Sequence, residues 1–549
     1  MAINLNAEQK SIRKLFYNTD QYVIPEFQRA YSWEYEQCDQ FYNDLLNAFI
    51  HNTDYFLGNI VLARSKENEN TPHIIDGQQR LITIWVLLKV FSVFVEDLDL
   101  ETTVLKIRAW KKGEEDSMKI ISCVGDQRDG ENIKILASYD ASNFHRRLEC
   151  CLDSRGKTLR IDKCANHIEY TALLFYQYLA NPEITSSRLE DFTNFVLDKV
   201  SLLPIQMGGD KLNEARENAL TIFETINNRG MDLQDADIFK ARLYAKAMAA
   251  KEEDNFMLRW NGLKENVVAL HTSVDEIFRC YYHIIRGIKG LTTAEKKLRD
   301  FFLNDRISPL TYGTHSEVMN DLEKIIKVHY RLKEYEKGDD YISSWLQVLN
   351  AYTNTFPRYA LVAYLFNNEQ QDPIDFLRYI KSIARYVYYM GSTTSVKFGI
   401  YGIIQRMSER LPINDFYHAN LKFSDLSTSS RLLTGYSLIA YYQANNPHIK
   451  NPLVEKIVYE SEIAQSRTLV GAESIDHDDV YTLGNSVVLG SSLRGRSITE
   501  RLKSIQEQPT GMAIKDDSVF NKNAYKRRQK AIQSLLVQFF LKDENNTDI

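Results

Sequence analysis

The sequence lacks the features that mark several special classes of protein. No apolar run reaches the roughly 18 residues of a membrane-spanning helix. Met1 to Asn6 contain no basic stretch leading into an apolar core, so we expect neither a membrane anchor nor a signal peptide. The six cysteines follow no paired metal-binding spacing, which favours free thiols in a reducing cytoplasm. No repeat of fixed length is visible, so a solenoid is not supported.

The middle of the sequence also lacks clustered histidines. Because a metal site needs several ligands, each isolated histidine there is interpreted as a structural or surface residue. These residues are His271, His283, His315, His329 and His418.

The composition is that of an ordinary globular protein. With 549 residues, 44% of them hydrophobic and 26% charged, the chain can form two to four domains with substantial cores. We expect a predominantly helical α+β protein in three parts. An α/β domain covers residues 1–245, with an insertion near 100–165 that consists of loops around a short strand. A helical connector or recognition domain covers 246–440, and a C-terminal domain covers 441–549.

The net charge of −6 is unevenly distributed. Residues 494–530 hold ten Lys and Arg against four Asp and Glu, a local balance of +6, so the rest of the chain carries −12. A basic patch on an acidic protein is compatible with binding phosphates at one place. The alternative is a solvated helix face, because charge runs on helices commonly serve solubility.

Five consecutive residues, Asp76-Gly77-Gln78-Gln79-Arg80, combine an acid, a glycine, two amides and an arginine. Ile74 and Ile75 precede them, and apolar residues recur at helical spacing after them. This pattern predicts a strand that ends at a tight turn at Gly77, and a helix that begins near Gln78 with Asp76 as its N-cap.

Such a turn suits an anion, because backbone N–H groups and the positive end of the helix dipole collect there. Arg80 adds a planar fork for phosphate oxygens. Asp76 would sit well on a magnesium ion or an attacking water. The alternative is that Asp76 only caps a core helix and Arg80 pairs with a neighbouring acid.

Other segments of the N-terminal part predict the surroundings of this turn. Residues 5–20 are expected to be helical, and residues 55–63 to form a strand in which Gly58 allows close approach of other groups. Arg29 is a second phosphate-type donor, next to Tyr31 and Trp33. These two aromatic residues would either stack on a base or belong to the core.

The Asp76 to Arg80 stretch, followed by an apolar helix, resembles the signature of the N-terminal domain of GmrSD-type restriction endonucleases. Two further blocks are similar to that family: Ile24 to Trp33 with Phe56 to Ile60, and Phe223 to Gly230 followed by Leu233, Asp237 and Lys240. Three ordered blocks with these spacings make the resemblance specific.

The resemblance implies a fold related to ParB and sulfiredoxin for the N-terminal domain. It also implies a nucleoside triphosphate, GTP or ATP, together with Mg²⁺ or Mn²⁺. Asp76 would act on the metal or on water. The residues expected to bind nucleotide and phosphate are Arg29, Gly77, Gln78, Gln79, Arg80, Asn227 and Arg229.

In that family the C-terminal half is a His-Asn-His (HNH) type nuclease, whose ββα unit holds a divalent ion and uses a histidine to activate water. Tyr481 to Leu489 resembles the family's Leu-Gly-Asn block, Ile498 to Lys503 the segment that carries a lysine, and Phe520 to Leu536 the closing Arg-rich helix. We therefore expect an HNH-like domain with Asn485 at its metal. Its DNA-binding residues would be Arg494, Lys503, Lys526, Arg527 and Arg528.

The sequence departs from the family's pattern at the residues that would carry out catalysis in this domain. The family's Glu-His-Ile-x-Pro-Gln motif falls on residues 460–465, where Ser461 replaces the histidine and Ala464 replaces the proline. Serine does not accept a proton near neutral pH as imidazole does. His477 lies among three acids and offers a substitute, although it stands closer to Gly484 than the family's motif does.

Two hypotheses follow. In the first, the chain is a DNA-directed defence enzyme in which nucleotide binding and hydrolysis at the N-terminal domain gate DNA cleavage. In the second, it is a nuclease-inactive subunit that senses nucleotide or DNA and works with a separate nuclease. Both imply DNA, with modified bases or backbone, as the partner, and we also expect a homo-oligomer. A purely structural scaffold has little support, because the N-terminal blocks retain reactive residue types.

Overall fold

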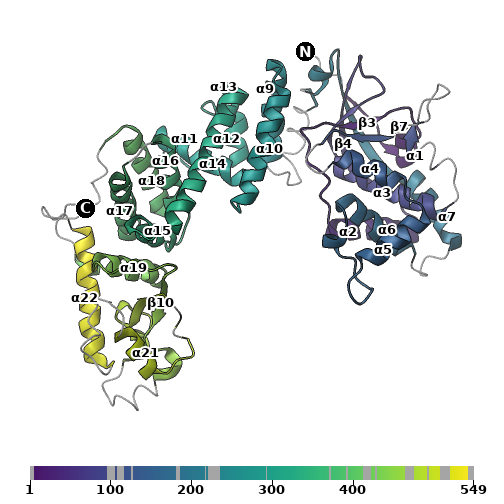
Figure 1. The fold of residues 1–549 in the computed structure, drawn as a ribbon. Coiled ribbons are helices and arrows are strands. Elements are labelled where there is room, and N and C mark those ends of the chain that lie inside the picture. Colours follow the sequence, from purple (N-terminus) through teal and green to yellow (C-terminus); the bar gives the residue numbers. More distant parts are fainter. Residues whose placement is uncertain are drawn as a thin grey trace. The chain divides into compact units, whose positions relative to one another are not determined.

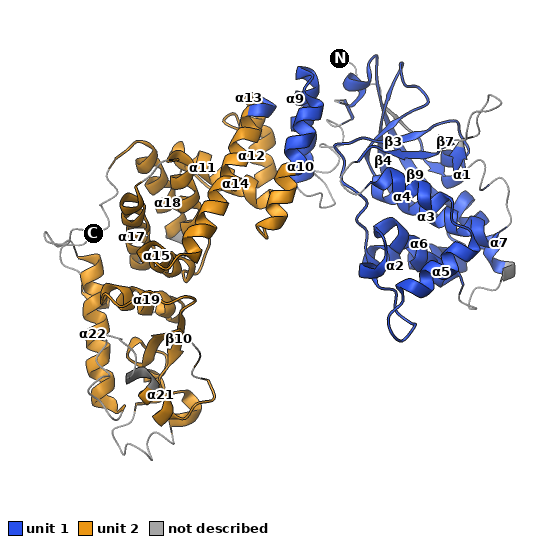
Figure 2. Ribbon diagram, viewed as in Figure 1, with its two compact units in different colours: residues 1–261, 314–316 blue, residues 262–313, 317–549 orange. Residues whose placement is uncertain are grey.

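The computed structural model describes residues 5–95, 100, 105–107, 117–124, 128–180, 186–216, 218–219, 235–291, 293–369, 372–390, 393–411, 422–426, 429–463, 475–490, 492, 494–506 and 520–541. It divides into two compact units. Figure 2 shows unit 1, residues 1–261 with 314–316, and unit 2, residues 262–313 with 317–549. The division into three domains stays a prediction. The described chain is α+β and predominantly helical, as expected.

Unit 1 is built on a mixed sheet with the strand order β1-β9-β4-β5-β3-β8, and β2 also pairs with β9. β4 is parallel to β9 and antiparallel to β5, while β3 is parallel to both β5 and β8. The strands are β1 (Leu5–Ala7), β2 (Lys10–Ser11), β3 (Tyr22–Ile24), β4 (Tyr55–Ser65), β5 (His73–Asp76), β8 (Ile120–Ser122) and β9 (Val200–Gly209), with a separate pair β6 (Lys106–Ile107) and β7 (Ser117–Met118).

This strand order brings several distant segments to one edge of the sheet. The carboxyl ends of β3, β5 and β8 meet there because the three strands run in the same direction. β4 runs the other way, so its first residues reach the same edge. The chain after β3, the Gly77 turn after β5 and the start of β4 are therefore neighbours.

Helices cover the sheet of unit 1 on the side seen below it in Figure 1. They are α1 (Ile12–Phe16), α2 (Tyr35–Ile50), α3 (Gln78–Phe94), α4 (Asp129–Ala137), α5 (Ala141–Cys151), α6 (His167–Leu179) and α7 (Ser186–Lys199). α9 (Asp235–Ala250) also belongs to unit 1 but lies outside this layer, next to α10 (Glu253–Ala269) (Figure 1). α3 is buried nearly all round, with Trp85, Leu88 and Phe91 fully inside. A helix without a polar face belongs in the centre of a domain. α3 therefore anchors the Gly77 turn, which precedes its first residue, to the core of unit 1.

Two secondary-structure predictions for unit 1 were wrong in part. The helix expected over residues 5–20 is present at α1, but residues 5–7 and 10–11 form strands β1 and β2 because they pair with the long β9. The expected loops near 100–165 include the helices α4 and α5, whose Ile133 and Phe144 belong to the main core. Pairing and burial that involve distant residues override the local pattern in both places.

Unit 2 consists mainly of packed helices. α10 (Glu253–Ala269) crosses the boundary between the units. The others are α11 (Val274–Ile288), α12 (Leu298–Asn304), α13 (Pro309–Tyr312), α14 (His315–Lys337), α15 (Tyr341–Asn350), α16 (Phe356–Asn367), α17 (Pro373–Met390), α18 (Thr393–Ser408), α19 (Leu433–Gln443), α21 (Ile498–Gln506) and α22 (Lys522–Phe540). The antiparallel pair β10 (Leu453–Lys456) and β11 (Ser486–Leu489) lies in its C-terminal part (Figure 1).

Candidate functional site

The turn between β5 and α3 has the predicted position but a different cap. Gly77 is the N-cap of α3 and has a left-handed φ of 90°. A Cβ atom at Gly77 would lie 2.5 Å from Cγ2 of Ile60, so only glycine fits without a shift of neighbouring atoms. Asp76 is not the N-cap, because it still pairs with Val61 as the last residue of β5. The first turn of α3 therefore has no side-chain cap.

Two guanidinium groups lie near the Asp76 carboxylate. Nη2 of Arg80 is 3.6 Å from Oδ2 of Asp76, and Arg29 is close enough to lower the Asp76 pKa. Burial has the larger effect and raises the pKa of Asp76 overall, against the opposing influence of Arg80, the Gly77 N–H and Arg29. The carboxylate and two cations thus share a half-buried site.

Gly58 makes room for Arg80, as its predicted role of allowing close approach requires. A Cβ atom at Gly58, whose φ is +116°, would lie only 2.2 Å from Nη1 of Arg80. The same Nη1 donates to the Leu57 carbonyl at 3.4 Å. The start of β4 therefore contacts this guanidinium at Nη1, while Nη2 is the atom nearest Asp76.

The two glutamines of the motif hold the chain that carries Arg29. Nε2 of Gln78 donates to the Arg29 carbonyl at 2.9 Å, and Nε2 of Gln79 donates to the Ala30 carbonyl at 3.1 Å. Oε1 of Gln79 accepts from the Ser32 N–H at 2.9 Å. Both side chains are buried, at 5% and 7% exposure. The predicted phosphate contacts are thus replaced by a positioning role, most completely for Gln79, whose amide is used on both sides.

Asp129 holds the same segment from another direction, and sequence reasoning missed it. Its Oδ2 accepts from the Tyr31 N–H at 2.7 Å, and the residue is only 2% exposed. Tyr31 is itself a core residue, with its hydroxyl 2.7 Å from that of Thr83. Trp33 packs partly buried against the same core. The core interpretation is confirmed for Tyr31, whereas Trp33 lies partly buried at the edge of the core.

The guanidinium of Arg29 takes no part in the contacts just described. The Arg29 backbone is held at the carbonyl, while its side chain makes no hydrogen bond or ion pair within the described part of the chain. The turn thus combines uncapped helix N–H groups, an unpaired guanidinium, a loosely paired one at Arg80 and the acid Asp76. This arrangement can bind an anion that approaches an acid.

The predicted contributors from the third sequence block are only partly visible. Asn227 and Arg229 lie outside the described residues. Asp237 and Lys240 lie on α9, and Nζ of Lys240 donates to the Glu26 carbonyl at 3.4 Å.

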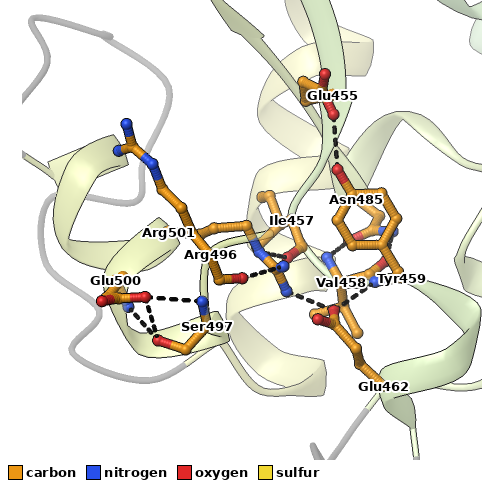
Figure 3. A network of polar contacts seen from close by, with 10 residues as sticks. All are labelled: Glu455, Ile457, Val458, Tyr459, Glu462, Asn485, Arg496, Ser497, Glu500 and Arg501. Carbon is orange, nitrogen blue, oxygen red and sulfur yellow. Dashed lines mark hydrogen bonds and ion pairs between the residues drawn. The ribbon is translucent and has the colours of Figure 1, made fainter. Parts of the chain in front are cut away.

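In unit 2, the C-terminal segments that resemble the nuclease frame form a hairpin followed by a helix. β10 pairs with β11 from Leu453 opposite Leu489 to Lys456 opposite Ser486, and α21 follows. Asn485 lies just before β11 and is fully buried (Figure 3). It accepts from the Val458 N–H at 2.9 Å and donates to the carbonyls of Val458 and Val480. A metal ligand at Asn485 would have to break these bonds, so we correct this assignment to a structural clamp.

Arg501 is the centre of the network in Figure 3 and was not predicted. It is 1% exposed, forms an ion pair with Glu462, and donates to the carbonyls of Ile457 at 3.2 Å and Arg496 at 2.8 Å. It ties α21 to the segment after β10. A basic residue within a basic helix gave no sequence signal of this burial.

Ser461 and His477 are brought to the same place. An open cavity of about 520 Å³ is lined by Lys456, Tyr459, Glu460, Ser461 and Tyr481. Nδ1 of His477 lies 3.6 Å from Oε1 of Glu460. The histidine is 64% exposed. The imidazole therefore lies next to Glu460, the residue that precedes Ser461.

The predicted DNA-binding residues divide into two groups. Arg494, Lys503, Lys526 and Arg527 are exposed. Arg528 is 1% exposed and donates to the Ser486 carbonyl, and burial lowers its pKa to about 10. Arg528 is therefore a structural contact between α22 and β11, and its assignment to DNA was wrong.

Among the described residues, one group of three possible metal ligands lies close together, in unit 1 and outside the Asp76 to Arg80 turn. Cys151, Cys164 and Glu169 have ligand atoms within 4.8 Å of one another. Glu169 is already bound by Arg147, at 2.7 and 2.8 Å, and burial raises the pKa of Cys164. These residues are better suited to a neutral core than to a cation.

Comparison with known proteins identifies the class of unit 1. Residues 12–244 match a family of restriction endonucleases, whose substrate is DNA. The family is described as GmrSD restriction endonuclease, N-terminal domain, and the match covers this region of the chain only. No curated protein matches the chain. None of the helices that the structure describes is long and apolar enough to cross a membrane.

Proposed function

We propose that this chain is a DNA-directed defence enzyme in which nucleotide binding and hydrolysis at the Asp76 turn gate DNA cleavage by the C-terminal part of unit 2. The geometry of the Gly77 turn supports the first half of this proposal, nucleotide binding and hydrolysis. Uncapped N–H groups of α3 meet Arg80 and Arg29 at one edge of a sheet, around the only acid of the motif. The Arg29 side chain makes no hydrogen bond or ion pair to the residues that the structure describes. Phosphate oxygens suit such donors.

A divalent cation fits this site only together with a phosphate. Mg²⁺ commonly binds through one or two carboxylates and the phosphates of its substrate. Asp76 supplies one carboxylate, and the nearby guanidinium groups of Arg80 and Arg29 oppose a cation that arrives alone. When bound, the metal would neutralise phosphate charge and polarise the bond that breaks.

The second half of the proposal rests on His477. This imidazole lies 3.6 Å from the carboxylate of Glu460, the residue that precedes Ser461, and it is open to solvent. A histidine in that place can accept a proton from water near neutral pH, which Ser461 cannot do. The HNH-like assignment of the hairpin and α21 belongs to this proposal.

One observation favours the alternative, a nuclease-inactive subunit that senses nucleotide or DNA. Within the described residues no set of three metal ligands surrounds His477, and Asn485 is committed to backbone groups. In that case the chain would bind modified DNA and depend on a partner subunit for cutting.

The two functions are separated by activity assays on the purified chain with Mg²⁺ or Mn²⁺. Phosphate release from GTP and ATP is measured for the wild type, for Asp76→Asn and for the exposed control Asp54→Asn. Nicking of plain and base-modified plasmids is measured for the wild type, His477→Ala and His145→Ala, a similarly exposed histidine beside a glutamate.

The enzyme proposal expects hydrolysis to fall at least about 100-fold in Asp76→Asn and cutting to be lost in His477→Ala, with both controls active. Hydrolysis without any cutting would establish the subunit. Absence of both activities would contradict both.

A further inference from the structure

Unit 1 contains a cavity of about 150 Å³, and its lining residues lie outside the Asp76 to Arg80 motif. One face of α9 forms its main wall, through residues spaced three and four apart. Phe27 closes it from the chain that follows β3, and the helical turn at 212–216 adds the polar side. The lining residues are Phe27, Asn213, Arg216, Ala241, Tyr244, Ala245, Met248 and Ala249.

The size and the walls of the cavity suit one flat ring. A cavity of about 150 Å³ in another protein is known to take up benzene. Three alanines of α9 leave the space open, and the rings of Phe27 and Tyr244 lie against each other at 5.1 Å between centroids. Apolar walls with aromatic rings favour a planar, weakly hydrated group.

Arg216 is the charged side chain that lines the cavity. The hydroxyl of Tyr244 donates to Glu26, which fixes both groups. Among the described residues Arg216 forms no ion pair: its Nη2 donates to Nδ1 of His73 at 2.8 Å and its Nη1 to Sδ of Met248 at 3.5 Å. A guanidinium has five N–H donors, and the Nε donor of Arg216 has no acceptor. Donors therefore remain for a ring nitrogen or a carbonyl oxygen.

His73 stays neutral in this network, so it adds no second positive charge. Burial and the neighbouring Arg216 lower the pKa of His73 to about 4. Its Nδ1 accepts from Arg216, which leaves the proton on Nε2. The arginine is thus held in place by a neutral acceptor that is tied to the sheet.

The cavity and the Asp76 turn share two elements. His73 and Asp76 are the two ends of β5, so they are about 10 Å apart along the strand. Phe27 and Arg29 lie two residues apart on the segment that Gln78 and Gln79 hold. A ligand with a ring at one end and phosphates at the other spans such a distance.

We infer that this cavity receives the base of the nucleotide whose phosphates bind at the Asp76 turn, with Arg216 donating to an acceptor on the base. This inference rests on the proposed nucleotide function. It assigns recognition of the base to residues outside the Asp76 to Arg80 motif, on α9 and on the turn after β9.

The test compares a ligand that has no base with ligands that have one. Calorimetric titrations with Mg²⁺ measure binding of inorganic triphosphate, GTP, ATP, UTP and CTP to the full chain. Ala245→Leu fills the cavity without removing a hydrogen bond. Ala250→Leu, on the exposed end of the same helix and outside the cavity, is the matched control. Arg216→Lys keeps the charge but loses the fork.

The inference expects at least one nucleotide to bind wild type about tenfold or more tightly than triphosphate. Ala245→Leu should lose this gain while its triphosphate affinity stays unchanged. Arg216→Lys should lose part of it, and Ala250→Leu none. Nucleotides that bind no better than triphosphate would overturn the inference and leave the phosphate site standing, whereas failure of both ligands to bind would overturn the proposed function as well.

A base extruded from DNA could also occupy the cavity, and the same variants distinguish it from the base of a free nucleotide. If Ala245→Leu weakens binding of a single-stranded oligonucleotide but leaves nucleotide affinity unchanged, the cavity reads DNA and the inference is wrong.

Discussion

The carboxylate of Asp76 lies at the end of a buried strand, where burial disfavours its charged form. Burial raises the pKa of Asp76, and Arg80 and Arg29 only partly oppose this. A structural acid would gain from a close partner, yet the distance to Arg80 is 3.6 Å. A buried, loosely paired acid beside guanidinium groups suits a site that a ligand completes.

Asp76→Asn should therefore make the fold more stable while abolishing nucleotide hydrolysis. Because the folded-state pKa of Asp76 is raised, the protein binds its proton more tightly when folded, and the charged form costs stability at pH 7. The variant should melt at a higher temperature than wild type at pH 7. This gain should shrink as the pH falls through the folded-state pKa and vanish below the ordinary pKa of aspartate, about 3.9. A lower melting temperature at pH 7 would mean that the carboxylate is structural.

The segment after β3 shows how one element positions the site. Gln78 and Gln79 of α3 bind the carbonyls of Arg29 and Ala30, and Asp129 of α4 binds the Tyr31 N–H. Three elements that are distant in sequence thus hold one short stretch of chain. Arg29 owes its place near Asp76 to contacts that its own side chain does not make.

Gln79→Ala should weaken both the fold and the phosphate site. The change leaves the Ser32 N–H and the Ala30 carbonyl without partners, at a cost of about 2 kcal/mol or more in the free energy of unfolding. Binding of inorganic triphosphate should fall about tenfold or more as Arg29 loses its position. The control is Gln177→Ala, which removes one exposed amide contact. Unchanged triphosphate affinity in a destabilised Gln79→Ala would show that Arg29 does not depend on this clamp.

The hairpin of unit 2 depends on Asn485 in a similar way. Asn485→Ala removes three buried hydrogen bonds to the backbone and should cost about 3 kcal/mol in the stability of this part of unit 2. Hydrogen exchange of the β10 and β11 amides measures this directly. Normal protection of these amides in the variant would contradict the structural role.

How far the sequence could predict these features depends on how far apart in the sequence the contacting residues lie. The Gly77 turn and α3 follow from consecutive residues, and both were predicted. The amides of Gln78 and Gln79 meet carbonyls 49 positions earlier, and Asp129 meets an N–H 98 positions earlier, so no local pattern reveals them. Arg528 resembles its exposed neighbours in sequence, and only the packing of α22 against β11 shows that it is buried.

The whole molecule carries buried neutral histidines in both units. Burial lowers the pKa of His73 and His329 to about 4 and that of His283 to about 3. The unfolded chain takes up protons near pH 6.5, so it binds more protons than the folded chain between that pH and about 4. The free energy of unfolding therefore decreases as the pH falls through this window.

Removal of His329 should flatten this dependence for unit 2. One histidine with these pKa values contributes about 3 kcal/mol of pH-dependent stability, which is fully present above about pH 6.5 and lost by about pH 4. Urea unfolding at a series of pH values measures the slope for wild type, His329→Gln and the exposed control His145→Gln. An equally steep slope in His329→Gln would show that this residue does not titrate on unfolding.

The measurement that tests the central claim most directly is DNA cleavage as a function of nucleotide. The purified chain is mixed with base-modified plasmid and Mg²⁺, with and without GTP or ATP, and the comparison is repeated with Asp76→Asn. We predict that nucleotide changes the rate of nicking by the wild type at least about tenfold, and that nicking by Asp76→Asn does not change with nucleotide. Cutting at the same rate with and without nucleotide, in both proteins, would contradict the claim that the Asp76 turn controls the nuclease.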